Sequence, residues 1–146
     1  MKITKILTDI LKSVGNLKSK MSYYGVDKGY VYYAPDGFRM YKIPQDNFLI
    51  DLEKAFPGKT PISDPKKLLN DSDAVAAVKT NEVRCYEKYN VIKIKNENTH
   101  AWINVNYLKE FEANCTFKIV NEKSPVFIYE FEELTGIILP VFIKEE

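Results

Sequence analysis

The chain has 146 residues, enough for one domain, and its 45% hydrophobic and 13% aromatic content excludes an intrinsically disordered protein. The net charge is +1, but it is uneven: eight basic against four acidic residues give +4 in 1–50, and thirteen against sixteen give −3 in 51–146. No apolar run reaches the roughly 18 residues of a membrane span, and lysines interrupt the N-terminal apolar residues. The sequence therefore predicts a cytoplasmic protein with no signal peptide and no membrane partner.

Residues 3–17 have the spacing of an amphipathic helix. Apolar residues recur three and four positions apart, which places them on one stripe: Ile3, Ile6, Leu7, Ile10, Leu11, Val14 and Leu17. Lysines lie off that stripe. Because Gly15 and Asn16 weaken the last turn, we expect the helix to end between Gly15 and Lys18.

Three strands rich in tyrosine and valine are expected next, at 21–25, 29–34 and 38–43. Asp27-Lys28-Gly29 separates the first two and Pro35-Asp36-Gly37 the last two. Both separators suit hairpins, because proline presets φ for a turn and glycine accepts a positive φ. Residues 1–43 thus predict a helix followed by a three-stranded meander.

The middle of the chain is less regular. We expect a short strand running into a helical turn at 47–56, a loop at 58–63, a helical segment at 66–70 capped by Asp64-Pro65, and another short helix at 71–78. Strands are then predicted at 83–89, 91–95 and 99–103.

The C-terminal part predicts one more helix and three more strands. Asn104 or Asn106 would cap the helix, with Tyr107, Leu108 and Phe111 facing inward, and strands would follow at 115–120, 125–131 and 136–143. A helix followed by three antiparallel strands therefore occurs at 3–43 and again at 105–143. The expected fold is one α+β domain over 1–146, with units of about 1–60 and 61–146 and both helices on one face of a curved sheet.

Residues that could carry out chemistry are few. There is no nucleophile motif, glycine-rich phosphate loop or HExxH motif, so we expect a protein that is not an enzyme. Cys85 and Cys115 lack CxxC spacing and predict buried free thiols, with a disulfide as the alternative. Together with the one histidine, His100, they predict no metal site and no cofactor.

Tyrosines gather on the first meander: Tyr23, Tyr24, Tyr30, Tyr32, Tyr33 and Tyr41. Basic residues flank them, and aromatic rings between basic residues can stack the bases of single-stranded nucleic acid. We favour the other interpretation, in which the rings face the core of a half-buried sheet. A weak single-stranded nucleic-acid binder is kept as an alternative function.

Ile103–Leu108 is similar to an "FN-x-x-YL" helix start, Ser124-Pro125-Val126 to an "SPV" strand, and Leu139-Pro140-Val141 to a hydrophobic-Pro-hydrophobic terminus. In these motifs the chain resembles the bacterial DNA polymerase III β sliding clamp family. Ala34–Met40 is similar to "A-T-D-G-x-R-L" of the same family. The resemblance covers 3–43 and 99–143, leaves 44–98 unaligned, and corresponds to one clamp domain where clamps have three.

The resemblance implies a DNA replication accessory or processivity factor. In the family, the "D-G-x-R-L" segment and the hydrophobic-Pro-hydrophobic terminus form the walls of a groove that binds clamp-binding peptides of replication and repair proteins. The resemblance therefore implies a peptide-binding site at Gly37, Phe38, Arg39, Met40, Leu139, Pro140 and Val141. Lysines of the first helix, Lys2, Lys5 and Lys12, would contact duplex DNA weakly. The alternative is a small interaction or inhibitor protein of a mobile element that does not bind DNA. A homo-oligomer is left open.

Overall fold

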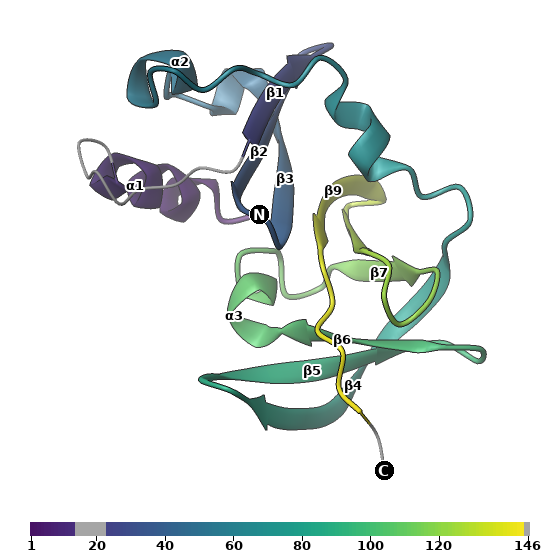
Figure 1. Ribbon diagram of the computed structural model, residues 1–146. Helices are drawn as coiled ribbons and strands as arrows, with labels where there is room; N and C mark the ends of the chain where they lie inside the picture. Colours follow the sequence, from purple (N-terminus) through teal and green to yellow (C-terminus); the bar gives the residue numbers. More distant parts are fainter. Residues whose placement is uncertain (14–22, 145–146) are drawn as a thin grey trace.

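The computed structural model describes residues 1–13 and 23–144 (Figure 1). Its helices are α1 (Ile3–Ser13), α2 (Leu52–Ala55) and α3 (Val105–Leu108), with 3-10 turns η1 (Gln45–Asn47) and η2 (Pro65–Leu69). The strands are β1 (Tyr23–Asp27), β2 (Tyr30–Asp36), β3 (Arg39–Pro44), β4 (Val75–Tyr86), β5 (Tyr89–Lys95), β6 (His100–Asn104), β7 (Thr116–Ile119), β8 (Val126–Glu130) and β9 (Glu133–Ile138). No helix within these residues is long and apolar enough to cross a membrane.

The described strands form one antiparallel sheet in the order β1-β2-β3-β9-β8-β7-β4-β5-β6. At the β6 end, Val141 forms an antiparallel bridge with Trp102, and its N–H donates to the Trp102 carbonyl at 2.8 Å. Val141 lies only three residues beyond the end of β9. The bridge therefore joins β6 back to the chain that leaves β9, and the six strands β9-β8-β7-β4-β5-β6 make a closed ring.

The predicted fold, an α+β clamp-like domain of two helix-plus-strand units, is wrong. The molecule is mostly one nine-stranded sheet, with 43% strand and 19% helix. The supposed second unit has a helix of only four residues, although Asn104 caps it as predicted, with its Oδ1 accepting from the Asn106 N–H at 2.8 Å. Residues 44–98, which the resemblance left unaligned, supply β4 and β5. These two strands lie between β7 and β6, so the C-terminal strands form a ring and not a second copy of the first unit.

The expected helix at 71–78 is also wrong, because Val75–Val78 begin β4. Alanines in this stretch favour a helix, but that preference is below about 1 kcal/mol per residue. Pairing decides the outcome: Val75 to Ala77 pair with β7, and Val78 and Lys79 pair with β5. Tertiary partners thus override a weak local propensity.

Helix α1 confirms the apolar stripe from Ile3 to Ile10, but not at Leu11. Ile6 and Ile10 are buried, Ile3 and Leu7 pack against the core in part, and Leu11 is exposed. Val14, Leu17 and the expected helix end lie outside the described residues, as do the first two residues of the predicted strand at 21–25. The first hairpin turn forms as expected, with positive φ at Lys28 and Gly29. The second differs from the prediction, because Pro35 and Asp36 belong to β2 and the turn consists of Gly37 and Phe38.

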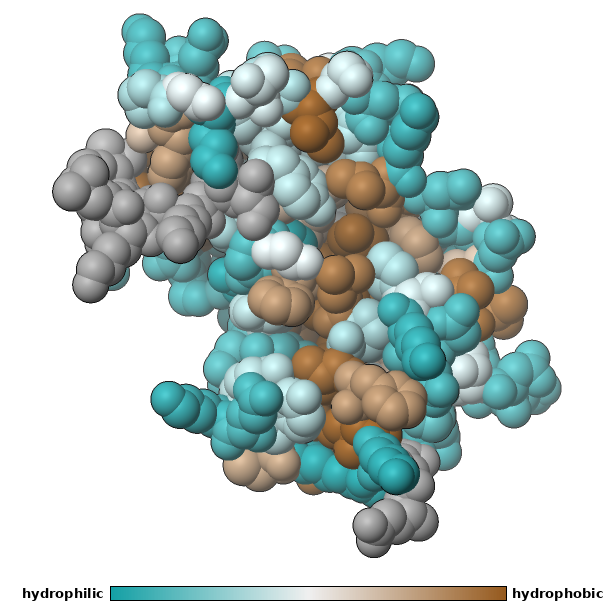
Figure 2. All heavy atoms as spheres, viewed as in Figure 1, coloured by the Kyte–Doolittle hydropathy of each residue, from teal (hydrophilic) through white to brown (hydrophobic). Residues whose placement is uncertain are grey.

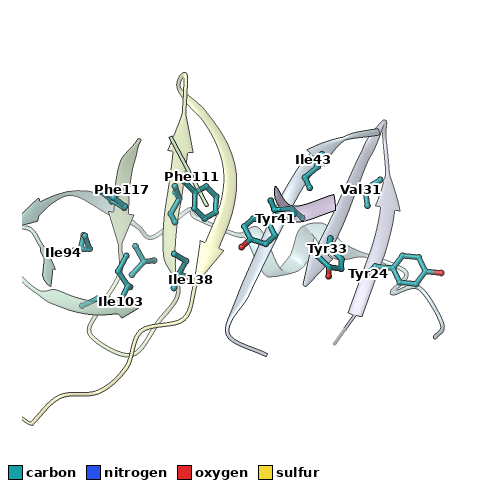
Figure 3. Packing of buried hydrophobic residues seen from close by; sticks show 14 of the residues in the cluster. Tyr24, Val31, Tyr33, Tyr41, Ile43, Ile94, Ile103, Phe111, Phe117 and Ile138 are labelled. Atoms are coloured by element: carbon teal, nitrogen blue, oxygen red, sulfur yellow. The ribbon is translucent and has the colours of Figure 1, made fainter. Parts of the chain in front are cut away.

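The main core lies on the sheet face that carries α1, and Figure 3 shows its two parts. Ile94, Ile103, Phe117 and Ile138 point into the space enclosed by the ring, whereas Tyr24, Tyr33 and Tyr41 lie along the open strands β1–β3. A second cluster lies on the opposite face, where Leu69 of η2 covers a set of buried side chains: Tyr32, Ala34, Met40, Phe127, Tyr129 and Ile137. Both faces near β3 are therefore buried.

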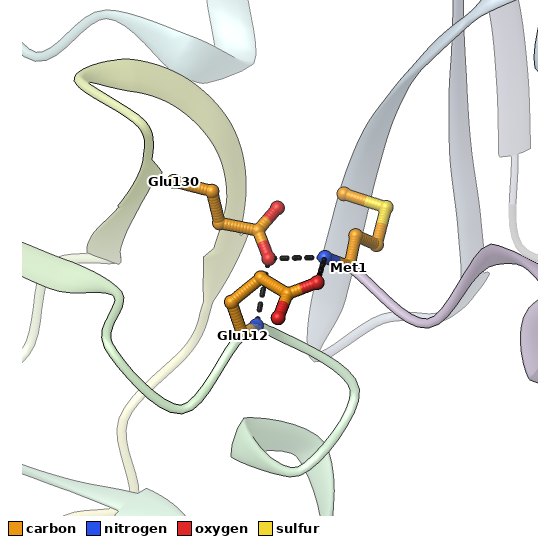
Figure 4. Close-up of polar contacts among 3 residues, drawn as sticks. All are labelled: Met1, Glu112 and Glu130. Carbon is orange, nitrogen blue, oxygen red and sulfur yellow. Dashed lines mark hydrogen bonds and ion pairs between the residues drawn. The ribbon is translucent and has the colours of Figure 1, made fainter.

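A buried ionic contact joins α1 to the ring (Figure 4). The Met1 ammonium contacts the Glu130 carboxylate and lies 3.0 Å from Glu112 Oε1. Glu130 Oε2 also accepts from the Glu112 main-chain N–H at 2.7 Å. Because Glu130 is buried, these partners replace the water that an isolated carboxylate would need.

Candidate peptide-binding surface

The two segments expected to wall a peptide groove lie side by side. Phe38 sits in the β2–β3 turn, where its N–H donates to Asp36 Oδ1 at 2.8 Å, an Asx turn that holds the start of β3. Arg39 pairs with Ile138 and Met40 with Ile137 across β3 and β9, and the Leu139 N–H donates to the Phe38 carbonyl at 2.8 Å. The structure thus brings Gly37–Met40 and Leu139–Val141 together.

This arrangement leaves no space between the two segments. They are hydrogen-bonded neighbours in one sheet, so a peptide cannot insert between them without breaking the ladder. Met40, the expected floor of the groove, is 0% exposed and packs in the second cluster. Any peptide must therefore lie on the surface of these segments, where Met40 does not reach it.

Exposed apolar side chains nevertheless remain here. We define the apolar belt as Phe38, Leu139, Pro140, Val141 and Phe142. Phe38 is 58% and Phe142 55% exposed, and Leu139–Val141 are partly exposed. Figure 2 shows brown side chains continuing along β9 and the chain that follows it, the yellow segment of Figure 1. Contiguous apolar surface of this kind marks interaction sites in many proteins.

Pro140 lies where the pairing of this segment changes. The chain pairs with β3 at Leu139 and with β6 at Val141, so it changes partner at Pro140. Proline has no N–H to donate to either neighbour, and it fits where one ladder ends and another begins. β3 therefore pairs with the chain before Pro140, and β6 pairs with the chain after it.

Arg39 is bound within the protein itself. Its guanidinium carbon lies 4.2 Å from the centre of the Tyr107 ring in α3, and its Nε is 3.4 Å from Asp36 Oδ2. Burial, followed by the Asp36 charge, raises the pKa of Tyr107 above its ordinary value. These contacts hold α3 against the start of β3. Arg39 therefore has a structural role, and its guanidinium is already engaged by Tyr107 and Asp36.

The three lysines expected at DNA have different surroundings. Lys5 forms an ion pair with the buried Glu110 carboxylate, so phosphate contact would break an internal interaction. Lys2, which precedes α1, and Lys12, which lies on it, are both exposed. Two exposed cations give little attraction for duplex DNA, whose binding depends on the number of neutralised phosphates.

The tyrosines of the first meander lie mostly inside the protein. Tyr24, Tyr32, Tyr33 and Tyr41 are buried, so their rings are not available to stack on bases. Burial raises the pKa of Tyr33 to about 12, because the neighbouring protein solvates a phenolate poorly. Tyr23 and Tyr30 are partly exposed, and Lys42 lies 4.2 Å from the Tyr30 ring centre.

Cysteine and histidine positions correct a further expectation. Cys85 is exposed and Cys115 is partly buried, so the prediction of two buried thiols is wrong for Cys85. Both are free, and no disulfide joins them. His100 lies in β6 opposite Lys95. No cluster of three histidine, cysteine or acidic side chains with metal-site geometry occurs within 1–13 and 23–144.

Two cavities in the structure were not predicted from the sequence. One of about 580 Å³ lies between β1, β2 and α2, with Phe48, Leu52 and Ile62 in its lining. The other, of about 440 Å³, lies under α3 and includes Cys115. Each is built from segments far apart in the sequence, so no local motif indicated them.

Comparisons with known proteins found no match for this chain. No protein-family model matched it, and neither did any curated protein or solved structure. Nothing in these comparisons identifies a sliding clamp, and the fold does not have the two-unit architecture that the resemblance implied. Functional conclusions therefore depend on the surface and cavities described above.

Proposed function

We propose that this protein is a non-enzymatic protein-binding module that receives a short apolar segment of a partner on the apolar belt. The observation that carries the proposal is the exposure of Phe38 and Phe142, the two aromatic residues of the apolar belt. Aromatic residues at the centre of such surfaces commonly contribute most to binding. Lys123, whose ammonium is 5.4 Å from the Phe142 ring centre, would favour an acidic residue beside the apolar anchor.

A role in DNA replication is not part of the proposal, because it depended on the clamp-like fold. DNA binding gains no support from Lys2, Lys5 and Lys12, of which one is already paired. The tyrosine meander likewise gives single-stranded nucleic acid few exposed rings.

The proposal can be tested by selecting binders from a library of displayed peptides. We expect selected peptides to share a large apolar residue, and Phe38→Asp to weaken their binding about tenfold to a hundredfold, since burying such a side chain is worth roughly 1.5–3 kcal/mol. Calorimetry with the selected peptides measures this effect. Phe38 is exposed in a turn, so its replacement should leave the fold intact.

Leu49→Asp is the matched control. Leu49 is a large apolar residue exposed elsewhere, between η1 and α2, and its replacement should leave peptide affinity unchanged. Selection of no peptide, or equal affinity for wild type and Phe38→Asp, would refute the proposal.

A further inference from the structure

A second site is independent of the apolar belt. The cavity of about 440 Å³ lies between α3 and the β4, β5 and β7 strands, and its apolar walls include Ile92, Leu108, Phe111 and Phe117. Its volume falls within the range of roughly 300–1,000 Å³ typical of sites for small ligands. α3 alone is too short to build such a wall, so the cavity depends on the ring that holds α3 over β5.

The charged residues around this cavity are mostly positive. Lys2, Lys79 and Lys109 are exposed in its lining, and none forms an ion pair with any residue of the described chain. Glu112 is the acidic residue among those that line it, and its Oε1 is already 3.0 Å from the Met1 ammonium. An excess of positive charge therefore surrounds an apolar interior.

We propose that this cavity binds a small amphipathic anion, a medium-length alkyl chain that carries one carboxylate. The alkyl chain would displace water from the walls at Ile92, Leu108 and Phe117, and apolar burial favours that exchange. The carboxylate would remain at the rim beside Lys79 and Lys109, where opposite charges attract and water still solvates it. The Phe38 surface takes no part in this binding.

The alkylation rates of the two cysteines measure directly whether the cavity is occupied. Cys115 lines the cavity, whereas Cys85 is exposed and outside its lining. A bound alkyl chain should cover the Cys115 thiol and leave Cys85 open. The two rates of alkylation, followed in one sample by mass spectrometry of peptides, therefore separate occupation of the cavity from any general effect of the ligand on the protein.

The experiment uses decanoate below its micelle concentration, with iodoacetamide at mildly alkaline pH. At ten times the dissociation constant, we expect alkylation of Cys115 to slow about tenfold, because the free fraction falls in proportion. Cys85 should react at an unchanged rate. Acetate, which lacks the chain, should protect neither cysteine. Decanol, which lacks the charge, should bind about threefold to tenfold more weakly than decanoate.

Variants assign the two parts of the site. Lys79→Gln with Lys109→Gln should weaken decanoate about threefold to tenfold and leave decanol unchanged, while Lys88→Gln in the β4–β5 turn should alter neither. Ala113→Trp, at an exposed lining position, should block the entrance and remove protection without disturbing the core.

Three results would overturn the proposal. The first is a Cys115 rate unchanged by decanoate, and the second is equal slowing of both cysteines. The third is equal affinity for decanoate and decanol in the wild type, which would remove the anionic part of the inference. None of these results depends on peptide binding at Phe38, so the two proposals stand or fall separately.

Discussion

At one end of the sheet, the outer edge of β1 has no paired strand among the described residues and accepts a hydrogen bond from the Ile62 N–H to the Tyr24 carbonyl at 2.8 Å. At the other end, β6 is joined to Val141. The open half, β1–β3, needs cover on both faces, which α1 and η2 provide. The closed half encloses its own aliphatic core. A sheet edge in this protein is thus protected either by separate segments or by ring closure.

The two halves also differ in what they bury. The open half relies on tyrosines, including Tyr24, Tyr33 and Tyr41, while the ring encloses mainly isoleucine, valine and phenylalanine. A tyrosine brings an ionisable hydroxyl into or near the core, and an aliphatic residue does not. The halves should therefore respond differently to substitution and to pH.

The largest expected effect is at the junction of the halves. Gly136 pairs with Tyr41 of β3 and with Ile128 of β8, and a Cβ at this position would lie 2.7 Å from the Met40 carbonyl oxygen. Gly136→Ala must shift backbone, so we expect the free energy of unfolding to fall by about 3 kcal/mol. Denaturant unfolding measures this change.

Gly37→Ala is its control, because a Cβ there meets nothing within 4 Å, and the change should stay within about 0.5 kcal/mol. A single shifted transition in Gly136→Ala would show that the halves unfold together. Two separate transitions would show that the ring is stable without the open half. An unaffected stability would contradict the packing described at this junction.

Alkaline pH should affect the open half through Tyr33. Its folded-state pKa is about 12, above the ordinary 10.0, so the tyrosine contributes its full stability below pH 10 and loses it as the pH rises to 12. The loss should be about 2 to 3 kcal/mol, two units at about 1.4 kcal/mol each. Chemical denaturation at a series of pH values follows it.

Tyr33→Phe has no hydroxyl to ionise at this position. Between pH 10 and 12, its free energy of unfolding should therefore fall by about 2 to 3 kcal/mol less than that of the wild type. Hydrogen exchange should show the β1–β3 amides opening before those of β5. A loss of equal size in wild type and Tyr33→Phe would show that Tyr33 ionisation is not responsible.

Ring closure has the smallest expected effect. Val141→Pro removes the N–H that donates to Trp102, so we expect a loss of about 1 kcal/mol, the usual net value of one hydrogen bond. The β6 amides should then exchange faster, as in an open edge strand. Lys144→Pro, at an exposed position beyond the bridge, serves as control. Unchanged exchange in β6 would indicate that the ring is held by side chains without this bridge.

Local patterns were enough to predict several elements. The apolar spacing of α1, the Asp27-Lys28-Gly29 turn and the Asn104 cap all appear in the structure, since each depends on neighbouring residues and backbone geometry. The middle of the chain was harder. Residues 75–86 form the longest strand although part of them favours a helix, because partners in β5 and β7 determine their conformation.

The candidate site shows the same division. Gly37–Met40 and Leu139–Val141 lie side by side, but the sequence did not reveal that their backbones pair or that Met40 is buried. The cavity at Cys115 had no signal at all, because Ile92, Leu108 and Phe117 contact it from three elements. Which apolar residues remain exposed is a property of the assembled sheet.

By itself the sequence determined the helix stripe, the first hairpins and an apolar C-terminal segment interrupted by proline, because dihedral preferences and side-chain alternation act over a few residues. Only the tertiary structure decided that nine strands join in one sheet, that Val141 closes a ring and that lysines surround a cavity beneath α3. Those features arise from pairing between distant segments, and each strand could pair in several ways until the whole core selected one.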